Sequence, residues 1–133
     1  MKDLFINISF RKSKTSHEDM NKLGTDAKAS GTKLIVFPEG TRNGSKGLKL
    51  LPFKKGAFHV ALDAKLPILP VVISEYDFLD TSRMSFQPGN VTIKVLARIE
   101  TSEYSKETMD SLVSHTRGTM ERELQSLAKT KTD

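Results

Sequence analysis

The sequence contains no cysteine, which excludes a disulfide framework and thiolate chemistry. Its three histidines, His17, His59 and His115, lie far apart and lack metal-ligand spacing, so we expect no metal site. The first residues have no apolar stretch of the kind that marks a signal peptide. The longest apolar run, residues 66–73, contains two prolines and is far too short to span a bilayer. We therefore expect no transmembrane segment in this chain.

Internal repeats, low-complexity blocks and linkers are also missing from the chain. A length of 133 residues suits one domain with a single core. The apolar share of 37% and the charged share of 28% are ordinary for a soluble globular domain. We therefore expect residues 1–133 to form a single domain.

Acidic residues are absent between Gly40 and Leu62, within a chain of formal net charge +5. The cations in this stretch are Arg42, Lys46, Lys49, Lys54 and Lys55. A run of this kind is either a solvated basic loop or a site for a phosphate-bearing partner. Composition alone leaves both interpretations open.

The apolar residues of the first half predict a strand, a helix and a second strand. Residues 4–6 form a short apolar run that predicts a strand. Ser16 and Asp19 resemble an acidic capping box, and a helical apolar spacing then runs as far as Gly31. Residues 33–37 are apolar and partly β-branched, which predicts a buried strand.

The second half continues the alternation of helices and strands. The spacing predicts a short amphipathic helix over 56–65, a buried strand over 66–73 and a half-buried strand over 91–97. A long helix is predicted from Ser105 onward, with one apolar face along its length. This order predicts an α/β fold with a partly parallel sheet flanked by helices.

A polar loop, Phe37-Pro38-Glu39-Gly40-Thr41-Arg42, directly follows the strand predicted over 33–37. Ligands of open α/β sheets bind outside the carboxyl ends of the strands, where this loop emerges. Gly40 lets backbone N–H groups approach an anion, Thr41 adds a hydroxyl, and Arg42 offers a planar fork that matches phosphate oxygens. Glu39 fits such a site if it orients Arg42 or accepts a hydrogen bond from a substrate hydroxyl. A turn with a surface ion pair is the alternative.

The same six residues match, one for one, the third signature block of the 1-acylglycerol-3-phosphate acyltransferases, also called lysophosphatidate acyltransferases. Residues 51–58 resemble the basic segment of that family, and residues 66–71 resemble its fourth block. The resemblance is strongest over residues 33–128 and is closest to the membrane-bound animal enzymes. It implies a glycerol-phosphate acyltransferase-like fold, of which this chain is the C-terminal portion.

The resemblance implies transfer of an acyl group from acyl-coenzyme A to lysophosphatidate, giving phosphatidate. Acyl-coenzyme A is then a co-substrate and no cofactor is expected; the partners are these two lipids and a membrane surface, with no nucleic acid. The full-length protein is expected at the endoplasmic reticulum membrane. The substrate-binding residues carried over are Glu39, Gly40, Thr41, Arg42, Lys54 and Lys55. By this resemblance Arg42 binds the acceptor phosphate, and Lys54 or Lys55 supports the same charge or the phosphates of coenzyme A.

Pro67 and Pro70 fall in the block credited with shaping the acyl-donor site, for which plain core packing is the alternative. His59, between Phe58 and Val60 on the predicted helix, is expected to pack rather than to catalyse.

The sequence departs from the family in its first two blocks. The first block is a histidine followed five residues later by an aspartate, where the histidine is the general base. The residues at that spacing are Lys22, Ala64 and Met120, so we assign no catalytic residue. In the second block, Phe5-Ile6-Asn7 matches but Ile8 replaces the arginine, which Arg11 could supply after an insertion. We expect an N-terminally truncated chain, from a gene-model or splice-variant start.

Two rivals to an active acyltransferase remain open. The first is a non-catalytic module that holds glycerophospholipid headgroups through the same loop. The second is a truncated product that has no function or that interferes with the full-length enzyme. A histidine–aspartate block in the complete open reading frame would separate them from the enzyme.

Overall fold

The computed structural model describes residues 17–41, 43, 49–75, 78–80 and 82–132. The strand predicted over residues 4–6, the cap predicted at Ser16 and the side chain of Arg42 lie outside the described residues. Nothing in the structure therefore tests these predictions.

The three α-helices form where the apolar spacing predicts them. They are α1 (His17–Ser30), α2 (Gly56–Asp63) and α3 (Met109–Thr132). Helix α1 ends as expected at Gly31, whose φ of 68° lets the N–H groups of Gly31 and Thr32 donate to the carbonyls of Lys28 and Ala27. Just before α3, a hydrogen bond with the Ser105 side chain lowers the pKa of Glu107 from its ordinary value of 4.5.

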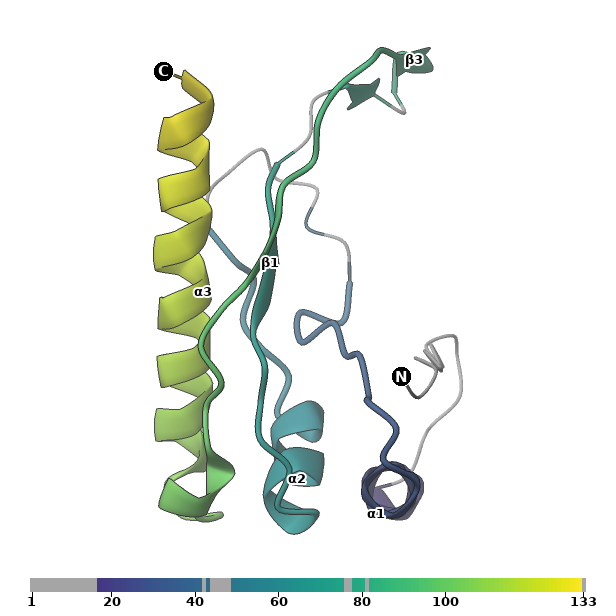
Figure 1. The fold of residues 1–133 in the computed structure, drawn as a ribbon, viewed down its shortest axis with the longest axis vertical. Coiled ribbons are helices and arrows are strands. Elements are labelled where there is room, and N and C mark those ends of the chain that lie inside the picture. The colour runs from purple at the N-terminus through teal and green to yellow at the C-terminus, as the bar shows by residue number, and fades with distance from the viewer. Residues whose placement is uncertain (1–16, 42, 44–48, 76–77, 81, 133) are drawn as a thin grey trace.

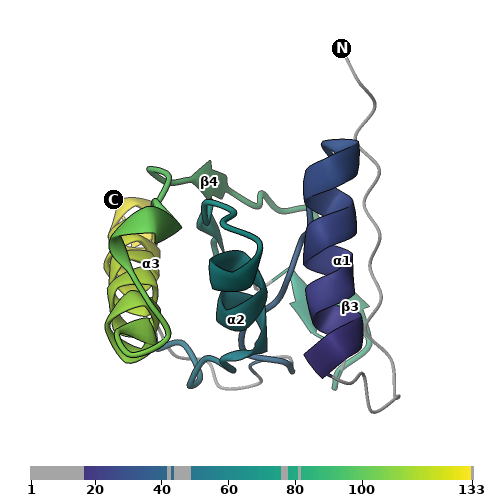
Figure 2. The same cartoon turned by 90° about the horizontal axis from the view of Figure 1, so that it is seen from below.

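The helices lie in one layer, with α2 between α1 and α3 (Figure 2). Helix α3 runs along the long axis of the molecule and contacts the short strand β1 (Val71–Ile73) (Figure 1). Strand β1 pairs with β4 (Ile93–Val95). A short hairpin of β2 (Leu79–Asp80) and β3 (Ser85–Phe86), which the sequence did not predict, stands at one end. A 3₁₀ turn, η1 (Thr101–Glu103), precedes α3.

The core lies between α2, the turn η1 and the start of α3. Leu112 is fully buried, and Phe53 and Phe58 stack with ring centroids 6.3 Å apart. Ile99 and Met109 complete the buried cluster. This core fixes α2, and therefore the loop that precedes it, against α3.

The predicted strand over 33–37 is wrong for the described structure. These residues have no strand assignment, and Ile35 and Phe37 are exposed. A strand exists only when a neighbour completes its hydrogen bonds, and among the described residues β1 pairs with β4 instead. Both strand pairs that the structure describes are antiparallel, so the expected parallel pairing is not among them.

The strand predicted over 66–73 is shorter and less buried than expected. Only Val71–Ile73 is assigned, with an isolated antiparallel bridge between Ile68 and Ile99. Pro67 and Pro70 have no N–H to donate, so the ladder is interrupted there. Val72 is buried, but the residues on either side of it in β1 are exposed.

The predicted half-buried strand over 91–97 is correct in position but wrong in burial, because all of β4 is exposed. Helix α3 covers the sheet face of Val72 and Lys94, and the Lys94 ammonium reaches Glu123 on α3. On the opposite face, no described residue buries the four paired side chains, which are Val71, Ile73, Ile93 and Val95.

Candidate functional site

The loop after residue 37 forms a tight turn at Pro38 and Glu39. The Gly40 N–H donates to the Phe37 carbonyl at 3.0 Å, and Gly40 has a φ of 69°, which glycine adopts without a steric cost. The Lys54 N–H donates to the Pro38 carbonyl at 2.8 Å. The turn is therefore attached to the segment that leads into α2.

Two side chains complete this contact between the segments. The half-buried Glu39 carboxylate accepts a hydrogen bond from the Leu51 N–H at 2.8 Å. The Lys54 side chain lies over Gly40, so closely that a methyl group at position 40 would come within 2.7 Å of Lys54 Cε and 2.9 Å of its Nζ. Glu39, Gly40 and Lys54, three of the predicted substrate-binding residues, are thus brought together.

This arrangement suits an anion more than a cation. The Lys54 ammonium stands beside an exposed glycine backbone and the exposed Thr41, which supplies a hydroxyl. One Glu39 oxygen accepts a hydrogen bond from the Leu51 N–H, which stabilises the negative charge of Glu39 and leaves its other oxygen for a hydroxyl. The site can therefore hold a phosphate next to a carboxylate that accepts from a hydroxyl.

Lys55, the sixth predicted binding residue, pairs with a residue of α3. Its ammonium is 2.6 Å from a carboxylate oxygen of Asp110, in the first turn of α3, and both side chains are largely exposed. In the described structure Lys55 therefore links α2 to α3. Its binding role stays a prediction.

The predicted acyl-donor residues lie after the other end of α2. Pro67 is exposed, whereas Pro70 is buried and its carbonyl accepts from the Leu96 N–H at 2.9 Å. Between them the backbones of Ile68 and Ile99 exchange two hydrogen bonds of 2.9 and 2.8 Å. Pro70 is thus attached to the chain just after β4, and Pro67 directly precedes the bridge of Ile68 with Ile99. A role of the two prolines in donor binding stays a prediction.

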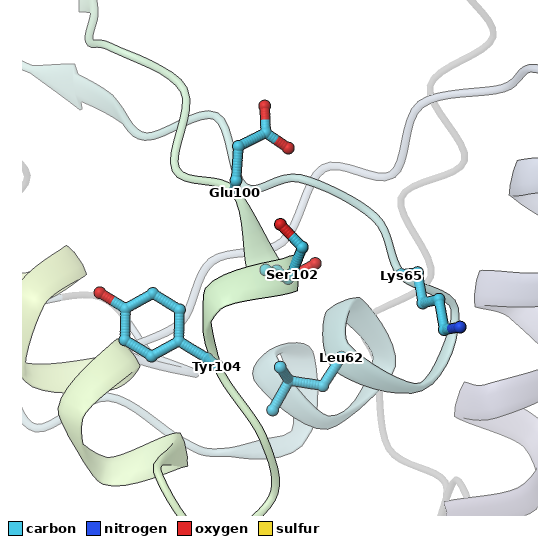
Figure 3. A pocket seen from close by; sticks show the side chains of 6 residues that line it. Leu62, Lys65, Glu100, Ser102 and Tyr104 are labelled. Atoms are coloured by element: carbon cyan, nitrogen blue, oxygen red, sulfur yellow. The ribbon is translucent and has the colours of Figure 1, made fainter.

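A pocket of about 300 Å³, which the sequence did not predict, opens near the C-terminal end of α2. Figure 3 shows Leu62 of α2 and Lys65 just after that helix on one side of the pocket, with Ser102 of η1 and Tyr104 just after that turn on the other. The turn at Pro38–Gly40 adjoins the opposite end of α2. No pattern in the sequence marks this pocket, because its walls come from segments about 40 residues apart in the chain.

His59 lies half-buried in α2 between Phe58 and Val60, which are both buried. This is the setting expected of a packing residue. Within the described ranges, no group of three histidine or carboxylate side chains is placed to hold a metal ion. Likewise, none of the described helices combines the length and apolarity needed to cross a bilayer.

Sequence reasoning missed two residues of α3 that bind the segment next to the loop. Arg117 and Glu121 on α3 bind the backbone of Leu50 and Leu51, the segment whose N–H reaches Glu39. The only signal in the sequence is their spacing of four residues on a helix, which is typical of any surface ion pair.

Comparison with known proteins places these features in a family. The profile of the Acyltransferase family matches residues 3–74, more than half of the chain. The chain belongs to the acyltransferase family. The match includes the turn at Glu39 and Gly40, the start of α2 and the segment of Pro67 and Pro70.

Individual relatives agree with the family match. The chain is 37% identical over 124 residues to the human 1-acyl-sn-glycerol-3-phosphate acyltransferase beta, an alignment that covers 92% of this chain and 44% of the human protein. It is 41% identical over 95 residues to 1-acyl-sn-glycerol-3-phosphate acyltransferase of Escherichia coli, covering 71% of this chain and 37% of the relative. The chain thus spans less than half the length of these curated relatives.

A solved structure has the same fold. The crystal structure of the 1-acyl-sn-glycerophosphate acyltransferase from Thermotoga maritima superposes with a TM-score of 0.66 and 30% sequence identity, over 81% of this chain and 44% of that one. The helices and small sheet of the described residues are therefore part of an α/β acyltransferase fold, as the sequence predicted.

Proposed function

We propose that this chain forms the acceptor side of an enzyme that transfers an acyl group to 1-acyl-sn-glycerol 3-phosphate. In that reaction the free acceptor hydroxyl attacks the acyl carbonyl of acyl-coenzyme A. The new ester bond forms as the carbon–sulfur bond breaks, coenzyme A leaves as the thiol, and the hydroxyl proton passes to a base. The product is phosphatidate.

The observation that carries the proposal is the group formed by Glu39, Gly40 and Lys54. The Lys54 ammonium and the glycine backbone offer contacts to a phosphate, and Glu39 is fixed in position to accept from an acceptor hydroxyl. Names of relatives that share this segment, such as the human and E. coli 1-acyl-sn-glycerol-3-phosphate acyltransferases, support the same acceptor. Arg42 would add a bidentate contact to the phosphate.

Further parts of the proposal concern the donor and the location. Acyl-coenzyme A is proposed as the donor, near Pro67 and Pro70, with no cofactor. The protein would work at the endoplasmic reticulum membrane, where basic residues of the loop, among them Lys54, would meet an anionic lipid surface. Because such contacts are electrostatic, raised salt should release the chain from vesicles that contain phosphatidate.

Binding of the acceptor tests the proposal. Arg42→Ala should weaken binding of lysophosphatidate, because a charge-assisted contact of roughly 1.5–3 kcal/mol is lost. Arg42→Lys should restore binding only in part, since a point charge does not reproduce the planar fork. Arg98→Ala is the matched control, because Arg98 is exposed and pairs with Glu100 outside the loop. Equal affinity of all four proteins, measured by calorimetry below the micellar concentration, would contradict the assignment.

A second candidate is a module that binds glycerophospholipid headgroups without catalysis. One observation favours it: none of the three histidines has an aspartate five residues on. Both candidates predict acceptor binding, and an assay for acyl transfer separates them.

A further inference from the structure

Two residues of the C-terminal helix, Arg117 and Glu121, contact the backbone of a segment far away in the chain. The Arg117 guanidinium donates to the carbonyls of Leu50 and Leu51, at 2.5 Å from Nη2 and 3.3 Å from Nε. The Glu121 carboxylate accepts from the Leu50 N–H at 3.0 Å. These contacts join positions that are 66 to 71 residues apart in the sequence.

The two side chains also bind each other, and both are partly buried. Arg117 Nη2 is 2.9 Å from the same Glu121 oxygen that accepts from Leu50. The Arg117 and Glu121 side chains are 35% and 22% exposed, whereas the cations of the other ion pairs that the structure describes are at least 50% exposed. A charged pair that is partly desolvated and bound to backbone groups on both sides has one preferred geometry. The pair therefore acts as a rigid clamp on Leu50 and Leu51.

The clamped segment in turn fixes the proposed site. The Leu51 N–H donates to Glu39, and three residues later the Lys54 N–H donates to the Pro38 carbonyl. Lys54 then places its side chain over Gly40. One continuous set of hydrogen bonds thus runs from α3 through residues 50–54 to the turn at Pro38–Gly40.

We propose that Arg117 and Glu121 are positioning residues for acceptor binding, which set the orientation of the Glu39 carboxylate and of Lys54 by holding Leu50 and Leu51. The expected effect on acceptor binding rests on the proposed function. Neither residue touches the acceptor. Without the clamp, Leu50 and Leu51 move, and Glu39 loses the donor that fixes its carboxylate.

The first experiment measures the clamp without any ligand. Arg117→Ala should raise amide hydrogen exchange at Leu51 and Lys54 by about tenfold or more, because charge-assisted hydrogen bonds are lost. Exchange at Ala64, whose N–H donates to Val60 within α2, should stay unchanged. Arg122→Ala is the matched control, because Arg122 contacts only its own helix, at Gly118 and Thr119, in the interactions that the structure describes. Equal exchange at Leu51 in the two variants would overturn the proposal.

The second experiment measures binding of lysophosphatidate to the full chain. We expect affinity to fall by about tenfold in Arg117→Ala and in Glu121→Gln, and to be partly restored in Arg117→Lys, whose ammonium can still reach one carbonyl. Glu123→Gln is the control for Glu121, since Glu123 pairs with Lys94 and not with Leu50. Circular dichroism confirms that each variant is folded.

The two readouts separate failure of the inference from failure of the proposed function. Normal acceptor affinity in Arg117→Ala, with exchange raised at Leu51, would overturn the positioning role, because the clamp would then be structural only. If the unsubstituted chain binds no lysophosphatidate, the proposed function fails, and the claim that the clamp serves acceptor binding is overturned with it. Raised exchange together with weakened binding, in the clamp variants alone, supports the proposal.

Discussion

At the scale of single residues, the site depends on one glycine whose conformation and surroundings both disfavour a side chain. Gly40 has a positive φ, and the space where a Cβ would lie is occupied by the Lys54 side chain. Gly31 has almost the same φ, 68° against 69°, but nothing lies within 4 Å of its Cβ position. A comparison of substitutions at the two glycines therefore distinguishes the effect of backbone strain from the effect of crowding by Lys54.

Substitution of these glycines by alanine should affect stability alike and binding differently. Each change should cost about 1 kcal/mol in free energy of unfolding, because alanine is strained at positive φ. Only Gly40→Ala should also displace Lys54 and weaken lysophosphatidate binding. Urea denaturation and calorimetry measure the two effects. An equal loss of affinity in Gly31→Ala would show that the effect is not local to the loop.

At the scale of elements, α2 positions the loop because it is held between two helices. Its contact with α1 is close: a methyl group on Gly24 of α1 would come within 2.5 Å of Val60 Cγ1 and 3.3 Å of Ala64 Cβ. On the other side, α2 contacts α3 through the core around Phe58 and Leu112. Gly24 thus sets how near the two helices can approach.

Alanine at Gly24 should therefore destabilise the chain, although alanine favours helices. Overpacking against Val60 costs about 1–3 kcal/mol, which exceeds the gain in helix propensity of up to about 1 kcal/mol. Gly118→Ala in α3 is the control, since no atom outside its own helix lies near its Cβ position, and it should stabilise by about 0.5–1 kcal/mol. Thermal unfolding measures both. A Gly24→Ala protein as stable as Gly118→Ala would contradict this account of the helix contact.

At the scale of the whole molecule, the described residues leave one face of the small sheet without cover. Helix α3 lies over the face of Val72 and Lys94, whereas Ile93 and Val95 on the opposite face are 64% and 58% exposed. A contiguous apolar face of this kind is unusual at the surface of a monomeric domain. In the human relative and in the Thermotoga maritima structure, the part that aligns with this chain is 44% of the length.

The purified chain of 133 residues should show no measurable acyl transfer. The thioester is already activated, so the remaining barrier is removal of the proton from a hydroxyl, for which a histidine oriented by an aspartate is suited. None of the three histidines has that spacing, and acceptor binding alone does not lower the chemical barrier. An assay with radiolabelled acyl-coenzyme A, against a heat-treated sample, measures turnover. Turnover that His59→Ala abolishes would identify His59 as the base and refute its packing role.

The sequence by itself determined the helices and the identity of the loop. Helical spacing and the stop at Gly31 depend on interactions between residues three to five apart, so the chain locally specifies α1, α2 and α3. The six residues from Phe37 to Arg42 likewise matched a signature block of the family before any fold was known, and the family match covers them. The anion site itself stays a prediction.

Only the tertiary structure decided which strands form, which faces are covered and how the loop is held. A strand needs a partner from elsewhere in the chain, so the apolar run over 33–37 could not by itself predict whether it pairs. Burial of β4 depended on a cover that the described residues supply on one face only. The clamp of Arg117 and Glu121 on Leu50 joins segments about 70 residues apart, and no local pattern encodes a contact over that separation.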